Sequence, residues 1–199
     1  MQFISTRGKE TVTGAQAIVE GIARDGGLFV PSAFPAVTRE ELEGMLGMDY
    51  PERAAFILHK YLDEYDKDEL LEALKKAYAQ FEGGDAAPLV RVENGMYMLE
   101  LFHGPTCAFK DMALTVLPYL LRKGCDLVGI KEKILILVAT SGDTGKAALE
   151  GFKDAEGIKI MVFYPDDGVS KMQKLQMCTQ EGGNVNVVAV KGNFDDCQT

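Results

Sequence analysis

Apolar runs and helically spaced segments alternate regularly over the last third of the chain. The runs are typical of buried strands, whereas the two segments between them place apolar residues at helical intervals. In chain order the five segments cover residues 133–140, 144–154, 158–165, 169–183 and 184–190. Continuous apolar strands joined by helices favour a parallel sheet with helices on both faces. We therefore expect an α/β fold with a βαβαβ unit at about residues 133–191.

Helical spacing dominates the first part of the chain. One segment begins at Thr38, a good N-cap residue followed by acids, and the next carries Pro51 at an acceptable first-turn position. Further on, two strand-like runs flank an Asn-Gly pair at residues 94–95, which is a strong hairpin signal. We expect residues 1–83 to form a mixed, mainly helical domain and residues 84–199 to belong to a second one.

The stretch "HGPTCAFKD" places Lys110 where a Gly-Pro-containing loop leads into a helix. The apolar spacing after it predicts a largely buried helix that starts near Phe109. A helix N-terminus carries partial positive charge, which disfavours a cation by a few tenths to about 1 kcal/mol. Lys110 therefore either points into solvent or has an amine that is meant to lose its proton. A neutral amine is the nucleophile of Schiff-base chemistry.

A second loop, "ATSGDTGK", joins a predicted strand to a helix at the carboxyl end of the sheet, where ligands of α/β proteins bind. Backbone N–H groups at a helix start bind anions, and the hydroxyls of Thr140, Ser141 and Thr144 add donors. The P-loop and Rossmann patterns both fail at required positions. The alternative is a plain turn in which Asp143 or Thr144 caps the helix.

Composition excludes several classes of protein. Acidic residues outnumber basic ones by 30 to 21 and the net charge is -9, with no basic block, so a nucleic-acid partner is not expected. No run of about 18 apolar residues and no signal-peptide pattern occurs, so we expect a soluble, cytoplasmic protein with no membrane partner. The four cysteines are far apart, which indicates neither a disulfide framework nor a metal site.

The two loops taken together resemble a known family. "HGPTCAFKDMAL" and "ATSGDTGKAAL" are similar to motifs of threonine synthases, which are fold-type II pyridoxal-phosphate enzymes. Further matches are "DGGLFVP", "VSKMQKLQM" and "GNFDDCQ", so the resemblance covers essentially all 199 residues. It implies a carbon-oxygen lyase that converts O-phospho-L-homoserine and water to L-threonine and phosphate, the last step of threonine biosynthesis. It also implies that residues 84–199 begin the catalytic region.

The resemblance assigns roles to individual residues. Lys110 matches the catalytic lysine that forms a Schiff base with pyridoxal 5'-phosphate and then carries protons. Asp143 matches a position near the cofactor's ring oxygen, where many relatives have Asn. The residues that the resemblance places near the substrate are Thr140, Ser141, Gly142, Thr144, His103 and Thr106. For His103, a structural hydrogen-bonding role is the alternative.

The resemblance also implies a missing part. Threonine synthases are longer and hold the cofactor's phosphate in a glycine-rich loop, whereas "GNFDDCQ" carries Asp195 and Asp196, which repel a phosphate. We therefore expect an N-terminal portion of the enzyme that is inactive alone. Two alternatives stay open: a related pyridoxal-phosphate-dependent phospholyase that does not make threonine, and a folded fragment without catalytic activity.

Overall fold

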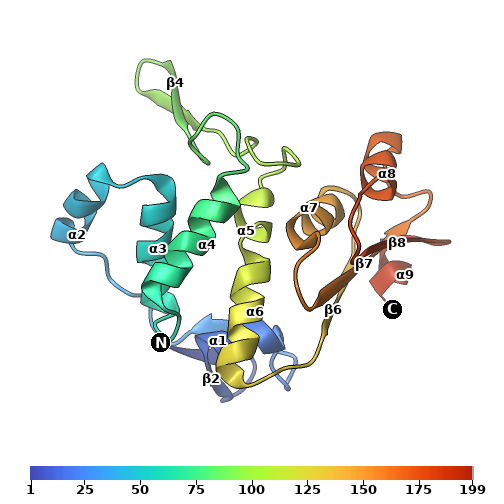
Figure 1. Cartoon of the computed structure of the whole chain (residues 1–199), viewed down its shortest axis with the longest axis horizontal. Helices are drawn as coiled ribbons and strands as arrows, with labels where there is room; N and C mark the ends of the chain where they lie inside the picture. Colours follow the sequence, from blue (N-terminus) through green and yellow to red (C-terminus); the bar gives the residue numbers. More distant parts are fainter. Residues whose placement is uncertain (199) are drawn as a thin grey trace. The chain divides into compact units, whose positions relative to one another are not determined.

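The computed structural model describes residues 1–198, and the chain divides into two compact units (Figure 1). The first unit contains Met1–Ala77 and Tyr119–Lys131, and the second contains Tyr78–Pro118 and the chain from Glu132 onward. The predicted domain boundary between residues 83 and 84 stays a prediction. In the structure, the chain leaves the first unit after Ala77 and returns to it for one further helical segment.

The first unit combines a small antiparallel sheet with helices. Its strands, in the order β2-β1-β3, are β1 (Gln2–Ser5), β2 (Thr11–Thr13) and β3 (Phe29–Pro31). Its helical elements are α1 (Gly14–Glu20), α2 (Arg39–Gly44), the short 3-10 helix η1 (Met45–Gly47), α3 (Tyr50–Tyr61), α4 (Lys67–Tyr78) and α6 (Leu117–Val128). The last residue of α4 and the first two of α6 belong to the second unit.

Helix starts in this unit are fixed by local sequence. Thr38 accepts a hydrogen bond from the Glu41 backbone, and the Glu41 side chain accepts one from the Thr38 backbone, which completes a capping box. The predicted N-cap of α2 is thereby confirmed. Pro51 lies in the first turn of α3, as predicted, where its missing N–H costs nothing.

The core of the first unit packs around Tyr65, which is 1% exposed. Its hydroxyl donates a hydrogen bond to the Leu120 carbonyl oxygen at 2.8 Å, which ties the chain before α4 to α6. Gly124 permits this approach, because a Cβ there would lie 2.8 Å from the Tyr65 hydroxyl oxygen. Leu70 and Leu74 of α4 are also fully buried.

The second unit contains a hairpin followed by the predicted βαβαβ unit. Its strands are β4 (Leu89–Glu93), β5 (Met96–Leu99), β6 (Ile134–Ala139), β7 (Ile158–Pro165) and β8 (Val185–Val190). Its helices are α5 (Asp111–Leu114), α7 (Asp143–Phe152), α8 (Lys171–Cys178) and α9 (Phe194–Gln198). The hairpin is confirmed, and Gly95 takes a φ of 76° in its turn, a conformation that suits glycine.

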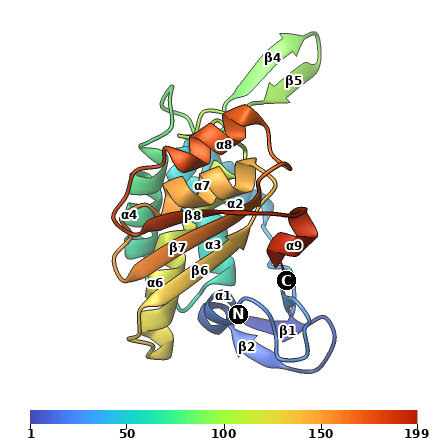
Figure 2. The same cartoon turned by 90° about the vertical axis from the view of Figure 1, so that its right-hand side faces the viewer.

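Strands β6, β7 and β8 pair in parallel, in that order, and lie side by side in Figure 2. Since right-handed crossovers connect strands added in one direction, α7 and α8 belong on the same face. Val162 on that face approaches α7, and Tyr164 contacts Cys178 of α8. On the opposite face Leu135 and Leu137 stay 56% and 63% exposed. The α/β fold is confirmed, but the expectation of helices on both faces is wrong at these positions.

The helix predicted to start near Phe109 is interrupted. Helix α5 covers only Asp111–Leu114, and α6 begins at Leu117. Pro118 explains the break, because proline has no N–H to donate and its ring clashes with the carbonyl four residues earlier, that of Leu114. Across residues 1–198, no helix combines the length and apolar character needed to cross a membrane.

Candidate functional site

Lys110 is the N-cap residue of α5, in right-handed helical conformation and without a capping side-chain bond. Its side chain is partly buried, and its Nζ lies 4.2 Å from the centre of the Phe109 ring. A cation over an aromatic face is stabilised by the ring quadrupole. In this conformation the amine rests on its own neighbour.

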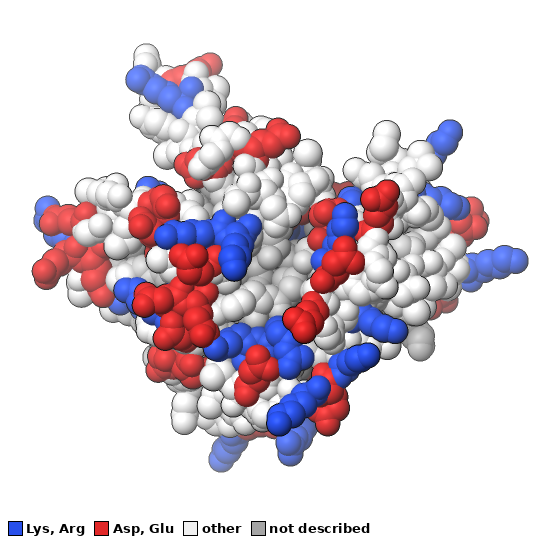
Figure 3. All heavy atoms as spheres, viewed as in Figure 1, with Lys and Arg blue, Asp and Glu red and all other residues white. Residues whose placement is uncertain are grey.

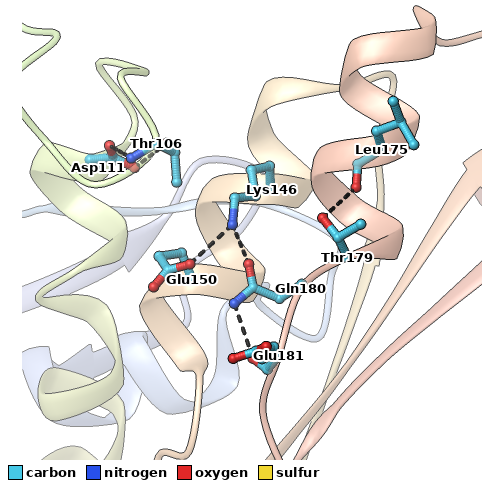
Figure 4. Close-up of polar contacts among 8 residues, drawn as sticks. All are labelled: Thr106, Asp111, Lys146, Glu150, Leu175, Thr179, Gln180 and Glu181. Atoms are coloured by element: carbon cyan, nitrogen blue, oxygen red, sulfur yellow. Dashed lines mark hydrogen bonds and ion pairs between the residues drawn. The ribbon is translucent and has the colours of Figure 1, made fainter.

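Asp111, the residue after the lysine, is almost completely buried at 1% exposure. Its two carboxylate oxygens accept hydrogen bonds from the Thr106 backbone N–H at 2.8 Å and from the Thr106 hydroxyl at 2.6 Å (Figure 4). Asp111 is not among the site residues predicted from sequence. The contact joins residues five positions apart through an irregular loop, so the sequence pattern gives no signal for it.

His103 lies at the start of the same loop. Its Nε2 lies 2.7 Å from the Glu100 carboxylate, and its ring stacks on Phe102 with 4.7 Å between ring centres. Its backbone carbonyl accepts a hydrogen bond from Glu82. These contacts show the structural role that was the alternative for His103, and its contact with substrate stays a prediction.

Thr140 organises the loop between β6 and α7. Its side chain is 2% exposed, and its Oγ1 accepts hydrogen bonds from the N–H groups of Gly142 at 3.0 Å and Gly145 at 2.9 Å. The N-cap position itself is Gly142, with a φ of 150°. The alternative in which Asp143 or Thr144 caps this helix is therefore wrong, because the capping oxygen comes from Thr140.

The first turn of α7 leaves donors available. Ser141, Asp143 and Thr144 have exposed side chains. In the described part of the chain, the backbone N–H groups of Asp143 and Thr144 have no hydrogen-bond partner. The Asp143 carboxylate accepts a hydrogen bond from Gln173 Nε2 at 2.9 Å, which holds that side chain toward α8. Unpaired N–H groups at a helix start suit an anion.

A cavity of about 150 Å³ brings the two loops together within the second unit. Its lining residues are Thr106, Cys107, Ala108, Asp143, Lys146 and Gln176. Of the residues predicted from sequence, Thr106 and Asp143 line this cavity. Lys110, His103 and the remaining residues of the second loop are not among its lining residues.

Lys146 supplies the cation of this cavity. It is not among the site residues predicted from sequence. Its Nζ pairs with Glu150 at 3.0 Å and donates to Gln180 (Figure 4). Burial raises the pKa of Glu150, but the hydrogen bonds from Lys146 and Gln180 outweigh it, so the pKa lies below its usual range. Glu150 therefore stays ionised at neutral pH.

Charge is otherwise mixed on the surface. On the face shown in Figure 3, basic side chains lie interspersed with acidic ones. Among residues 1–198, no group of three or more His, Cys, Asp or Glu side chains is arranged to hold a metal ion.

The known proteins that this chain resembles include threonine synthases. The family model described as "Threonine synthase N terminus" matches residues 2–78. The threonine synthase of Pseudomonas aeruginosa is 39% identical over all of this chain, which spans 42% of that relative. The threonine synthase of Schizosaccharomyces pombe is 36% identical, again over all of this chain and over 40% of the relative.

A solved structure agrees with these relatives. The pyridoxal-phosphate-bound threonine synthase of Brucella melitensis superposes with a TM-score of 0.91 and 36% identity, over all of this chain and 43% of that one. The chain thus spans about two fifths of the length of the relatives that it matches. We conclude that the chain corresponds, over its whole length, to the N-terminal portion of threonine synthases.

Proposed function

We propose that the chain carries the lysine and the anion-binding loop of a pyridoxal-phosphate-dependent lyase. The reaction is the conversion of O-phospho-L-homoserine and water to L-threonine and phosphate. The cavity that joins the loop before Lys110 to the first turn of α7 carries the proposal. The Brucella melitensis relative, described as bound to pyridoxal phosphate, supports the same cofactor. The proposal keeps the small-molecule substrate and the cytoplasmic location expected from the sequence.

The residues around this cavity fit an anionic aldehyde. Lys146 and Asp143 line the cavity and contribute a positive charge and a backbone N–H group without a partner in the described chain. Thr144, which follows Asp143 in α7, has a second such N–H group. Lys110 is the primary amine nearest in sequence to the cavity-lining residues of its loop. A cation and free N–H groups suit an anionic ligand, and a primary amine suits an aldehyde.

Bound pyridoxal phosphate would supply an aldehyde that reacts with amines and a ring that stabilises negative charge beside the substrate's amino group. The Lys110 amine acts as the nucleophile in its neutral form and afterwards carries a proton at Nζ. The N–H groups of Asp143 and Thr144 bind the substrate carboxylate. Thr140 holds those groups in place through its two hydrogen bonds within the loop.

The proposed role of Asp143 is electrostatic. Its carboxylate is held by Gln173, so its charge lies at the edge of the cavity where the helix start favours an anion. Ser141 is assigned to hydrogen bonding with the substrate, and Gly142 allows the backbone to turn there with its φ of 150°. The part of the relatives that this chain does not match supplies the remaining contacts.

Reductive trapping tests the proposal. The purified chain is mixed with excess pyridoxal phosphate and reduced with borohydride, which fixes the cofactor on the lysine it has reacted with, and peptide mapping locates it. We expect the label on Lys110. A Lys110→Arg variant should lose it, whereas Lys133→Arg, which changes an exposed lysine of the same unit, should not.

Label on Lys146 or Lys123 with none on Lys110 would overturn the assignment. The substrate is tested separately with a longer protein that contains this segment. Threonine as product supports the synthase, whereas a keto acid indicates the related phospholyase. Absence of any preferred lysine would indicate the non-catalytic alternative.

A further inference from the structure

Asp111 has an environment that a surface helix start would not need. The side chain is 1% exposed, and burial of a carboxylate is costly unless its oxygens are hydrogen-bonded. Both oxygens are satisfied by Thr106, through its N–H at 2.8 Å and its hydroxyl at 2.6 Å. One buried acid therefore clamps one residue of the loop at two points.

The loop is built closely around this clamp. A Cβ at Gly104 would lie 2.5 Å from the Asp111 Cβ, so the backbone of the loop packs directly on the aspartate. Cys107 has a φ of 59°, a left-handed conformation that is strained for a residue with a side chain. Such strain persists only where the surrounding structure holds it, and here the clamp spans the strained residue.

Lys110 lies between this clamp and the helix that follows. Its backbone carbonyl accepts a hydrogen bond from Leu114 at 2.9 Å, which fixes it from the C-terminal side. From the N-terminal side, the bonds between Asp111 and Thr106 close the loop that ends at the lysine. We infer that Asp111 is a positioning residue for Lys110, an inference that rests on the proposed role of that lysine.

The carboxylate itself has no free role in this arrangement. Both its oxygens are engaged and buried, so Asp111 acts through the loop rather than on a ligand. An asparagine has the same shape but no charge: its amide oxygen can accept from the Thr106 N–H and its NH2 group can donate to the Thr106 hydroxyl oxygen, so two charge-assisted hydrogen bonds become weaker neutral ones. Asp111→Asn should therefore loosen the loop without changing its volume.

Lysine acylation without cofactor tests this inference. Acetic anhydride is applied to the folded wild-type chain and to the Asp111→Asn variant, and the rate at Lys110 is divided by the rate at exposed Lys133. The replacement of two charge-assisted hydrogen bonds by neutral ones raises loop opening roughly tenfold or more. The Lys110 ratio and the hydrogen exchange of the Thr106 amide should rise by a similar factor. Asp167→Asn, which removes an exposed charge of the same unit, should change neither.

An unchanged Lys110 ratio in a folded Asp111→Asn chain would overturn the inference, even where Thr106 exchange rises. If that variant does not fold, Thr106→Val is used instead, because it removes only the hydroxyl hydrogen bond. A rise in its Lys110 acylation ratio supports the inference, and an unchanged ratio overturns it. Reductive trapping with pyridoxal phosphate separates the two proposals. A wild-type chain that traps no cofactor at Lys110 refutes the proposed function, whereas the acylation ratio still decides the positioning role.

Discussion

The hydroxyl oxygen of Thr140 lies 2.9 Å from the backbone nitrogen of Gly145 and accepts its hydrogen bond. The same oxygen accepts from Gly142 at 3.0 Å, so one buried side chain closes the turn from β6 into α7. The capping oxygen thus comes from the end of the strand. Asp143 of the first helical turn is therefore not needed as a cap, and it lines the cavity instead.

Thr140→Val should destabilise the chain by about 1–3 kcal/mol, because it keeps the shape but leaves the Gly142 N–H without its buried acceptor and the Gly145 N–H with only the Gly142 carbonyl. Thr140→Ser keeps the oxygen and should cost only about 0.8 kcal/mol for the lost methyl group. Urea unfolding monitored by circular dichroism measures both. Equal losses in the two variants would show that the hydrogen bonds contribute little.

Gly145→Ala should cost about 1–3 kcal/mol, because an added Cβ overpacks the contact with the strand. It would overlap the Thr140 methyl group and lie 3.0 Å from Val162 Cγ1. Gly44→Ala is the matched control: Gly44 is also helical, but nothing lies within 4 Å of its Cβ position. There alanine should stabilise by up to about 1 kcal/mol. Urea unfolding measures the stability of both variants. A stabilised Gly145→Ala variant would contradict the close contact of Gly145 with Thr140 and Val162.

The ion pair of Glu150 with Lys146 predicts sensitivity to acid. The pKa of Glu150 is lowered in the folded chain, so its stabilisation is present above the unfolded pKa and is lost as pH falls through the folded one. The stability difference between wild type and Glu150→Gln should therefore shrink as pH falls from about 7 to about 3. Urea midpoints across that range test it, and a constant difference would refute it.

Tyr65 predicts sensitivity to alkali. Burial, followed by the nearby charge of Glu64, raises the pKa of its hydroxyl well above the usual range. A raised pKa means that its stabilisation is complete below the unfolded pKa of about 10 and declines as pH rises beyond it. Tyr65→Phe should cost about 1 kcal/mol at neutral pH. The difference in free energy of unfolding between wild type and Tyr65→Phe should be smaller in strong alkali than at neutral pH. Urea unfolding under both conditions measures it, and an unchanged difference would contradict the prediction.

The chain alone should not make threonine. It spans 42% of the Pseudomonas aeruginosa relative, and a cofactor misplaced by about 1 Å can lose on the order of a hundredfold in rate. Phosphate released from O-phospho-L-homoserine, with excess pyridoxal phosphate, should match the background without protein. Multiple turnovers to threonine would show that these residues suffice.

Much of the second unit could be predicted because its signals are local. Apolar strand runs, the Asn-Gly turn before β5 and the loop before α7 each depend on neighbours in sequence. Asp111 could not be predicted as part of the site, because its burial depends on a loop that folds back to Thr106. The break at Thr115–Val116 was missed because apolar spacing continues through Pro118 and conceals the helix stop.

The exposure of Leu135 and Leu137 could not be predicted from local sequence pattern either. Leu135 and Leu137 are as apolar as the buried residues of β7, so the runs gave no sign of which face helices would cover. Only the strand order, with both crossovers adding strands in one direction, decides that α7 and α8 share a face. Periodicity identifies elements, whereas topology assigns their partners.

The Gln173 side chain makes two hydrogen bonds at once, and together they restrict which residues fit at positions 143 and 173. Its Oε1 accepts from the Ser170 backbone in the capping box of α8, while its Nε2 donates to Asp143. Glutamate would serve the capping box as well as glutamine does, but it would set a second carboxylate against Asp143. The two positions should therefore co-vary among relatives: an acid at 143 calls for glutamine at 173, and a neutral residue at 143 releases 173 to become acidic.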